Sequence, residues 1–543
     1  MAKLNDFFIG YADGETEAQE SLFKDMFYKD NQKYEEITKN WVKFIISGPK
    51  GSGKTILSRY IKEIYEEQNI QCKILKNDSI ILNQLINLGQ TPSDSSEIII
   101  FYKWFILLEF SKMIFNKKFT HKDIEPSFFK RLSPTSKKDF SKYSNAYDNL
   151  LNLYNERFNK GNYESSSINT LEQINSLLSG NLNVTPLPST KLDVKAECQE
   201  KLSQEKSLIL KPYFKMITEF EENLLICMRY HKIVLILDDI DEMKVKLDTD
   251  EKSRNFLESL IIVLKDLNSK FKDYDLCPNK CILLLRSDIL NTLNKYSSNL
   301  NKILADRQVD LYWLDKDNKY PENHILIDML FHKIRLSCKE YKDLNNKELY
   351  NKLFPEKING KSATNFLLDY SFGRPRDIIY YLGVIQKRFK NHTHFAPTSF
   401  IQCENEYSNL LKKELLNELA LHLEIDYVED LLRLISDFKQ LSFYYKDIKK
   451  YYDDNTSNYP HISDFKKSIS DLYSFGILGN SYKIINTEVP SNKHNAPIYS
   501  WAYRRDGSNE VNYNQKLSVH YGLRSALGLK KKKEKKRKKK KDS

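Results

Sequence analysis

The 543-residue chain contains little glycine and proline, 16 and 15 residues respectively. Turn-rich all-β proteins depend on both residue types to reverse the chain, so this scarcity argues against that class and favours long helices. Aromatic residues, in contrast, are plentiful, and 41% of the residues are hydrophobic, which is enough to build folded cores. A chain of this length is expected to form two to four domains.

Long hydrophobic runs and paired cysteines are also missing. We find no run of about 18 apolar residues that would span a membrane and no apolar core of a secretory signal near the N-terminus. Cys277 and Cys281 have no second pair with which to complete a tetrahedral zinc site. We therefore expect a soluble, cytoplasmic protein without a membrane span, whose seven cysteines are reduced structural thiols.

The formal net charge of +12 is concentrated at one end of the chain. Residues 530–543 contain 11 Lys or Arg and two acidic residues, and the rest of the chain has a net charge of only +3. Because these like charges repel and no apolar residue accompanies them, we expect a disordered Lys-rich tail. The overall basicity is therefore no argument that the folded part binds nucleic acid.

Apolar segments of strand length alternate with helical patterns in the first 320 residues. Five segments are predicted to be strands: 44–46, 72–75, 233–237, 282–285 and 309–313. Alternating strands and helices predict an α/β fold, a three-layer core with a mainly parallel sheet. We assign this core to 1–320, with a partly disordered insertion at about 90–230. Helical patterns at 321–437 predict a helical lid domain, and 438–529 has the outline of a winged-helix-like domain.

A phosphate-binding motif follows the first predicted strand. Its eight residues fit the pattern G-x-x-x-x-G-K-[ST] and are Gly48, Pro49, Lys50, Gly51, Ser52, Gly53, Lys54 and Thr55. Glycines allow backbone N–H groups to turn inward around phosphate oxygens, and the following helix adds positive potential at its N-terminus. Lys54 is expected to reach the β- and γ-phosphates, and the Thr55 hydroxyl to complete a Mg²⁺ shell.

Carboxylates come directly after the buried segment 233–237. Since the strand ends at the carboxyl edge of the sheet, they are expected to lie beside the phosphate loop. Asp238 is the candidate Mg²⁺ ligand, through water, and Asp239 the candidate group that polarises the attacking water. A Glu is commoner than an Asp in the second position, so hydrolysis is expected to be slow or stimulated by a partner.

Four arginines are candidates for contacts with nucleotide phosphates. Arg286 follows the fourth predicted strand, where a γ-phosphate sensor is expected. Arg307 precedes the last strand, which suits a residue that reaches the nucleotide of a neighbouring subunit. Arg374 and Arg376 flank Pro375 at the start of a helix in the lid, where a guanidinium on the γ-phosphate would report hydrolysis.

Together these motifs resemble the bacterial P-loop ATPases of the STAND and KAP groups within the AAA-like ATPases. The resemblance is carried by the loop Gly48 to Thr55, by Leu237-Asp238-Asp239, by Leu285-Arg286-Ser287-Asp288 and by Gly373-Arg374-Pro375-Arg376-Asp377. A weaker match, Phe7 to Gly10 followed by Glu15 and Glu17, implies a segment that packs against adenine. The resemblance implies ATP and Mg²⁺ as cofactors, a nucleotide-gated switch that is often oligomeric, and a place in bacterial defence or stress responses.

Nucleic acid is a possible further partner, through either of two regions. In the winged-helix outline, Lys466 and Lys467 of the second helix and Arg504 and Arg505 near the wing would contact DNA. The Lys-rich tail would bind nucleic acid or acidic lipid without sequence specificity. The alternatives are a C-terminal domain used only for packing, because Asp464 and Asp471 share the second helix with the two lysines, and a tail that is merely solvated.

The sequence thus predicts an ATPase that acts as a nucleotide-gated regulatory or remodelling switch, with a possible effector protein as partner. Two alternatives remain: a nucleotide-dependent DNA-binding protein in which hydrolysis is incidental, and a nucleotide-bound scaffold that does not hydrolyse. Neither a nuclease nor a protease site is evident from the sequence.

Overall fold

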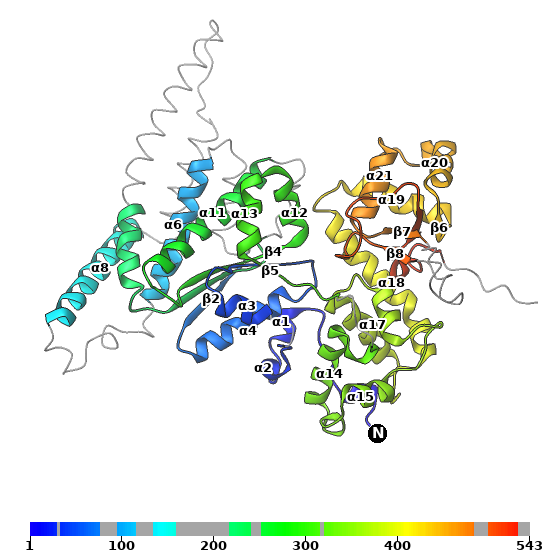
Figure 1. Cartoon of the computed structure of the whole chain (residues 1–543), viewed down its shortest axis with the longest axis horizontal. Coiled ribbons are helices and arrows are strands. Elements are labelled where there is room, and N and C mark those ends of the chain that lie inside the picture. The colour runs from blue at the N-terminus through cyan, green and yellow to red at the C-terminus, as the bar shows by residue number, and fades with distance from the viewer. Residues whose placement is uncertain are drawn as a thin grey trace, which may run out of the picture. The chain divides into compact units, whose positions relative to one another are not determined.

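The computed structural model describes residues 1–29, 33–76, 95–115, 134–158, 217–240, 251–314, 320–482 and 498–529. These residues fall into two compact units. Figure 1 shows the chain coloured by residue number, with its helices and strands labelled. The lid unit is formed from residues within Met1–Asn31, Pro49–Ile56 and Tyr312–Ser543, and the sheet unit from residues within Gln32–Gly48 and Leu57–Leu311. The domain boundaries drawn above at 320, 437 and 529 stay predictions.

The sheet unit is built on five parallel strands in the order β2-β3-β4-β1-β5. Each predicted strand is found, with these bounds: β1 (Ile45–Gly48), β2 (Gln71–Leu75), β3 (Ile233–Leu237), β4 (Lys280–Arg286) and β5 (Gln308–Asp310). The last strand is shorter than the predicted 309–313. Its partner β1 pairs with it only as far as Ser47, because β1 then gives way to the glycine-rich loop.

Helices cover both faces of this sheet (Figure 1). Alternate strand residues point to opposite faces, so Ile233, Leu235 and Leu237 join a hydrophobic core with the helices on one face, while Val234 and Ile236 are buried on the other. The helices of the sheet unit are α3 (Lys33–Lys39), α4 (Lys54–Glu67), α6 (Ser95–Ile114), α8 (Pro134–Phe158), a helical stretch at 217–227, α11 (Glu251–Asp273), α12 (Ser287–Tyr296) and α13 (Ser298–Arg307). The structure is therefore α/β with a parallel sheet, as predicted.

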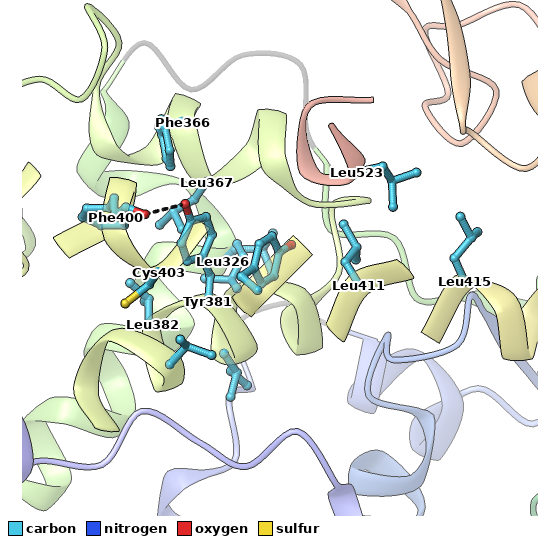
Figure 2. Packing of buried hydrophobic residues seen from close by; sticks show 14 of the residues in the cluster. Leu326, Phe366, Leu367, Tyr381, Leu382, Phe400, Cys403, Leu411, Leu415 and Leu523 are labelled. Carbon is cyan, nitrogen blue, oxygen red and sulfur yellow. Dashed lines mark hydrogen bonds between the residues drawn. The ribbon is translucent and has the colours of Figure 1, made fainter. Parts of the chain in front are cut away.

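The helical part of the lid unit follows the pattern predicted for 321–437. Its elements are η1 (Leu4–Asp6), α1 (Gly14–Glu17), α2 (Phe23–Met26), η3 (Pro321–Asn323), α14 (Ile325–Ser337), η4 (Lys339–Tyr341), α15 (Asn346–Leu353), α16 (Ala363–Tyr370), α17 (Pro375–Arg388), α18 (Pro397–Leu419) and α19 (Ile425–Phe438). Figure 2 shows the core between α17 and α18, where the hydroxyl of Tyr381 donates to the carbonyl of Phe400 at 3.1 Å.

The C-terminal part of the lid unit is a four-stranded antiparallel sheet with two main helices. Its elements are β6 (Ser442–Phe443), α20 (Tyr445–Asp454), η5 (Thr456–Asn458), α21 (Phe465–Ser474), β7 (Leu478–Tyr482), β8 (Ile498–Ser500), β9 (Lys516–Val519) and η6 (Tyr521–Leu523), with strand order β6-β9-β7-β8. The sequence pattern predicts helices at 443–452 and 462–475, the second ended by Gly476, and a strand pair at 477–479 and 498–503 around a wing-like loop at 490–497. Both helices and the strand pair are present, and Gly476 follows α21 with φ +73°. That this is a winged-helix domain stays a prediction.

Several predictions fall on residues outside those described, namely the Ser- and Pro-rich segment at 160–200, the wing loop at 490–497 and the tail at 530–543. No helix within the described ranges combines the length and hydrophobicity needed to cross a membrane. The six cysteines in the described part of the chain are free thiols, and five of them are buried.

Candidate nucleotide-binding site

The predicted phosphate loop connects β1 to α4. Gly51 and Gly53 have φ values of +81° and +98°, in the left-handed region that favours glycine. A side chain at Gly51 would place its Cβ 2.9 Å from the Cβ of Arg376, whereas a Cβ at Gly53 would meet nothing within 4 Å. The loop is therefore closely packed at Gly51 and open at Gly53.

Two side chains of the loop fit an anionic ligand. The ammonium of Lys54 reaches back across the loop and donates to the carbonyl of Pro49 at 3.3 Å. The hydroxyl of Ser52 is fully buried and has no hydrogen-bond partner among the described residues. A buried hydroxyl without a partner is costly, and a phosphate oxygen would satisfy it.

Trp313, which belongs to the same unit as residues 49–56 of the loop, makes a hydrogen bond to the loop. Its indole N–H donates to the carbonyl of Ser52 at 2.8 Å, and its ring is almost fully buried. This contact fixes the middle of the loop against the chain that follows β5. It joins residues 261 positions apart, and no local motif at Trp313 indicates it.

Asp238 and Asp239 lie at the carboxyl end of β3, as predicted. Asp238 is 1% exposed and accepts a hydrogen bond from the Ser58 hydroxyl of α4 at 3.2 Å. Because Ser58 lies one helical turn after Thr55, this bond fixes the carboxylate beside the first part of the helix that starts with Lys54. Asp239 has φ +56°, is partly exposed, and lies 3.8 Å from the ammonium of Lys76.

Arg286 is the last residue of β4, and its Cα is paired with that of Gly48 at the end of β1. The strand order places β4 between β1 and β3, so Arg286 lies directly beside the strand that leads into the loop. Its guanidinium is 9% exposed and donates from Nε to Asp288 Oδ1 at 3.0 Å. The predicted phosphate contact would require Arg286 to exchange this partner.

Arg307 lies at the other edge of the sheet. Its carbonyl accepts from the backbone N–H of Phe44, the residue before β1, at 3.0 Å. Parallel strands run in one direction, so this edge is opposite to the one where β1 enters the phosphate loop. The predicted contact of Arg307 with the nucleotide of a neighbouring subunit stays a prediction.

The two arginines that flank Pro375 have different partners. Arg376 contacts the loop: its backbone N–H donates to the Gly51 carbonyl at 3.4 Å, and its Nε donates to the Ala12 carbonyl at 2.9 Å. Arg374 is 3% exposed and pairs with Asp377 and Glu418 within the helical region. Burial opposes its charge, but these two carboxylates raise its pKa above the ordinary value for arginine.

The N-terminal segment that was compared with an adenine-packing segment lies along the start of α4. A Cβ at Gly14 would lie 2.8 Å from the side chain of Ile56 and 3.5 Å from that of Thr55. The segment is fixed by Glu17, which is buried, pairs with Lys333 of α14, and accepts from the backbone N–H of Tyr11 at 2.8 Å. Gly14 thus lies beside the first residues of α4, whereas a Cβ at Gly10 would meet Lys333 and Glu17 instead.

Of the candidate DNA-contacting residues, some are exposed to solvent and others pack against the protein. Lys466 and Lys467 of α21 are exposed. The guanidinium carbon of Arg505 lies 4.1 Å from the centroid of the Tyr312 ring, and its backbone N–H donates to the Tyr312 hydroxyl at 3.1 Å. Arg505 therefore packs against the chain that follows β5, and Arg504 is half-buried.

Residues 324–416 match a family described as the FunZ-associated C-terminal helical domain. The match begins just before α14 and ends within α18, so it covers the helices from α14 to most of α18 and leaves the sheet unit outside. No curated protein matches the chain.

Proposed function

We propose that the protein binds ATP at the loop Gly48 to Thr55 and hydrolyses it. The observation that carries this proposal is the loop itself, in which the Lys54 ammonium bridges to Pro49 and the buried Ser52 hydroxyl lacks a partner among the described residues. Positive potential, inward-turning glycines and an unsatisfied donor are what a phosphate group would use.

In the proposed reaction, Thr55 of α4 and the charged residues at the ends of β3 and β4 would bind the metal, orient the water and contact the terminal phosphate. Thr55 and Asp238 are the oxygen donors that would hold Mg²⁺, which neutralises developing charge on the phosphates. Asp239 would orient the attacking water once its carboxylate turns from Lys76. Arg286 would contact the terminal phosphate. The Asp238–Ser58 hydrogen bond supports this assignment because it orients the carboxylate against the loop helix.

The lid unit contains an arrangement through which nucleotide would be sensed. Arg376 is bonded to the loop, and five residues earlier the carbonyl of Ser371 lies 3.2 Å from Nε2 of His520. The ring of Phe372 stacks on that of His520 with centroids 4.4 Å apart. Burial lowers the pKa of His520 to about 3, so the imidazole is neutral at physiological pH. A shift of Arg376 would thus be transmitted to the C-terminal sheet, which supports a nucleotide-gated switch.

The test is nucleotide binding and phosphate release by the full chain carrying Lys54→Ala. We expect both to fall at least about a hundredfold, because the removed ammonium is the principal charge aimed at the phosphates. Lys62→Ala is the matched control, since Lys62 lies on the same helix and pairs with Glu66, one turn further on, at 3.8 Å. Hydrolysis by Lys54→Ala at the wild-type rate would overturn the proposal.

A further inference from the structure

Glu414 of α18 contacts two cations, one within the phosphate loop and one on the helix that is bonded to the loop. Its Oε2 lies 3.6 Å from the ammonium of Lys50, the third residue of the loop, and 3.3 Å from a terminal nitrogen of Arg376. The three side chains are 21–30% exposed, so the ion pairs are partly shielded from water. One carboxylate oxygen of Glu414 therefore forms ion pairs with two cations from different segments of the chain.

The position of Glu414 is fixed by the packing of α18 on α17. The rings of Tyr381 and Tyr407 stack with centroids 4.2 Å apart and an interplanar angle of 9°. Leu411 and Leu415, which flank Glu414 in the sequence, point into the same core (Figure 2). Glu414 and Arg376 are thus carried on one packed helix pair, whereas Lys50 belongs to the loop.

A carboxylate and a phosphate are bound by these cations in the same way. Both present anionic oxygens that Lys binds as a point charge and Arg binds through its planar set of donors. An anion that enters the loop comes beside Lys50, which is part of the loop, and beside Arg376, whose backbone is bonded to Gly51. It therefore meets two cations that already have a counter-ion.

We propose that Glu414 is an internal competitor of the nucleotide phosphates, which share Lys50 and Arg376 with it and displace it when they bind. This inference rests on the proposed nucleotide binding and adds its regulation. Glu414 weakens nucleotide binding, and its displacement releases α18 from Lys50. The competitor thus couples occupancy of the loop to the contact between the loop and the helical part of the lid unit.

The test compares Glu414→Gln with the wild-type chain by equilibrium binding of ADP and of a non-hydrolysable ATP analogue. Two partly exposed ion pairs of ordinary strength correspond to about fivefold in an equilibrium constant, so we expect a Kd about fivefold lower for the variant. The difference should shrink as salt is added, because screening weakens exposed pairs. Glu406→Gln, which removes one exposed carboxylate from the same helix, should leave the Kd unchanged.

A Kd for Glu414→Gln that equals or exceeds the wild-type value would overturn the inference. Thermal unfolding of the variant shows whether it is folded, and Glu414→Asp, which keeps the charge but shortens its reach, should give an intermediate Kd. If the wild-type chain binds no nucleotide, the proposed function fails and this inference with it. If the wild-type chain binds, Lys54→Ala abolishes binding and Glu414→Gln changes nothing, the competition alone is rejected.

Discussion

The carboxyl ends of β3 and β4 and the turn that starts α17 both carry charged residues, but they hold their charges in different ways. At the strand ends, Arg286 pairs with Asp288, two residues further on, and Asp238 accepts from the backbone N–H of its neighbour Asp239 at 3.0 Å and from the Ser58 hydroxyl of α4 at 3.2 Å. At the turn, Arg374 and Arg376 pair with Glu418 and Glu414 on another helix.

This difference separates charges that are available for chemistry from charges that hold helices together. The guanidinium of Arg286, whose partner Asp288 is close by in sequence, can exchange that partner for a ligand without separating distant elements. Arg374, in contrast, joins α17 to α18 through a buried pair, and loss of one partner of a buried pair is strongly destabilising because the other charge remains uncompensated. We therefore expect substitutions at the turn to change stability most and substitutions at the strand ends to change activity most.

The largest effect is expected for Arg374→Ala. The substitution leaves Asp377 and Glu418 without their buried cation, which should cost about 3–5 kcal/mol of stability. Arg376→Ala is the matched control, and should cost at most about 1 kcal/mol because its ion pair is partly exposed. Denaturant unfolding of the two variants measures the difference, and equal midpoints would remove the distinction drawn between the two arginines.

Asp238→Asn is expected to show the opposite behaviour. The amide has the same shape: its oxygen can accept from the Asp239 backbone N–H, and its NH2 group can donate to the Ser58 hydroxyl, which also accepts hydrogen bonds. The midpoint of unfolding should therefore change little. The proposed metal would lose a charged ligand, and Mg²⁺-dependent phosphate release should fall about a hundredfold. Asp306→Asn, at an exposed position on α13, serves as the control. Unchanged phosphate release by Asp238→Asn would show that this strand end has no part in hydrolysis.

Gly51→Ala is expected to have the smallest effect and lies where the loop meets the turn. Its φ of +81° strains any other residue, at a cost of about 1–3 kcal/mol, and the new Cβ would also press on Arg376. Gly360→Ala has nearly the same φ, +82°, with open space around the Cβ, so it isolates the backbone strain. We expect only Gly51→Ala to weaken nucleotide binding; equal binding by the two variants would argue that the contact with Arg376 is unimportant.

The strand ends could be predicted from the sequence because their signals are local. Five consecutive buried residues from Ile233 to Leu237 are followed at once by two carboxylates, and β3 has these bounds. The glycine motif likewise gave the start of α4 at Lys54, and Gly476 gave the end of α21. Each of these signals lies within about eight residues of the element that it predicts.

The contacts of the lid unit could not be predicted in this way. The sequence places Arg374 and Arg376 symmetrically around Pro375, and only the packing of α17 on α18 and on the loop gives them different partners. Arg376 and Ala12 are 364 residues apart, and Trp313 and Ser52 are 261 apart. Glu414 is one of many acidic residues on a helix, and neither periodicity nor a motif marks it as the partner of Lys50.

The N-terminal segment of the lid unit has a consequence for folding during synthesis. Tyr28 donates to Asp328 at 2.6 Å, Glu17 pairs with Lys333, and Gln386 donates to the Phe7 carbonyl at 2.8 Å. These partners leave the ribosome 300 or more residues after the segment itself, a delay of at least roughly 15–60 s at ordinary elongation rates. The sheet unit has all its strands once residue 310 has been made. The parallel sheet can therefore form first. The hydrophobic residues Leu4, Phe7 and Ile9 stay unburied until the helices that cover them have been synthesised.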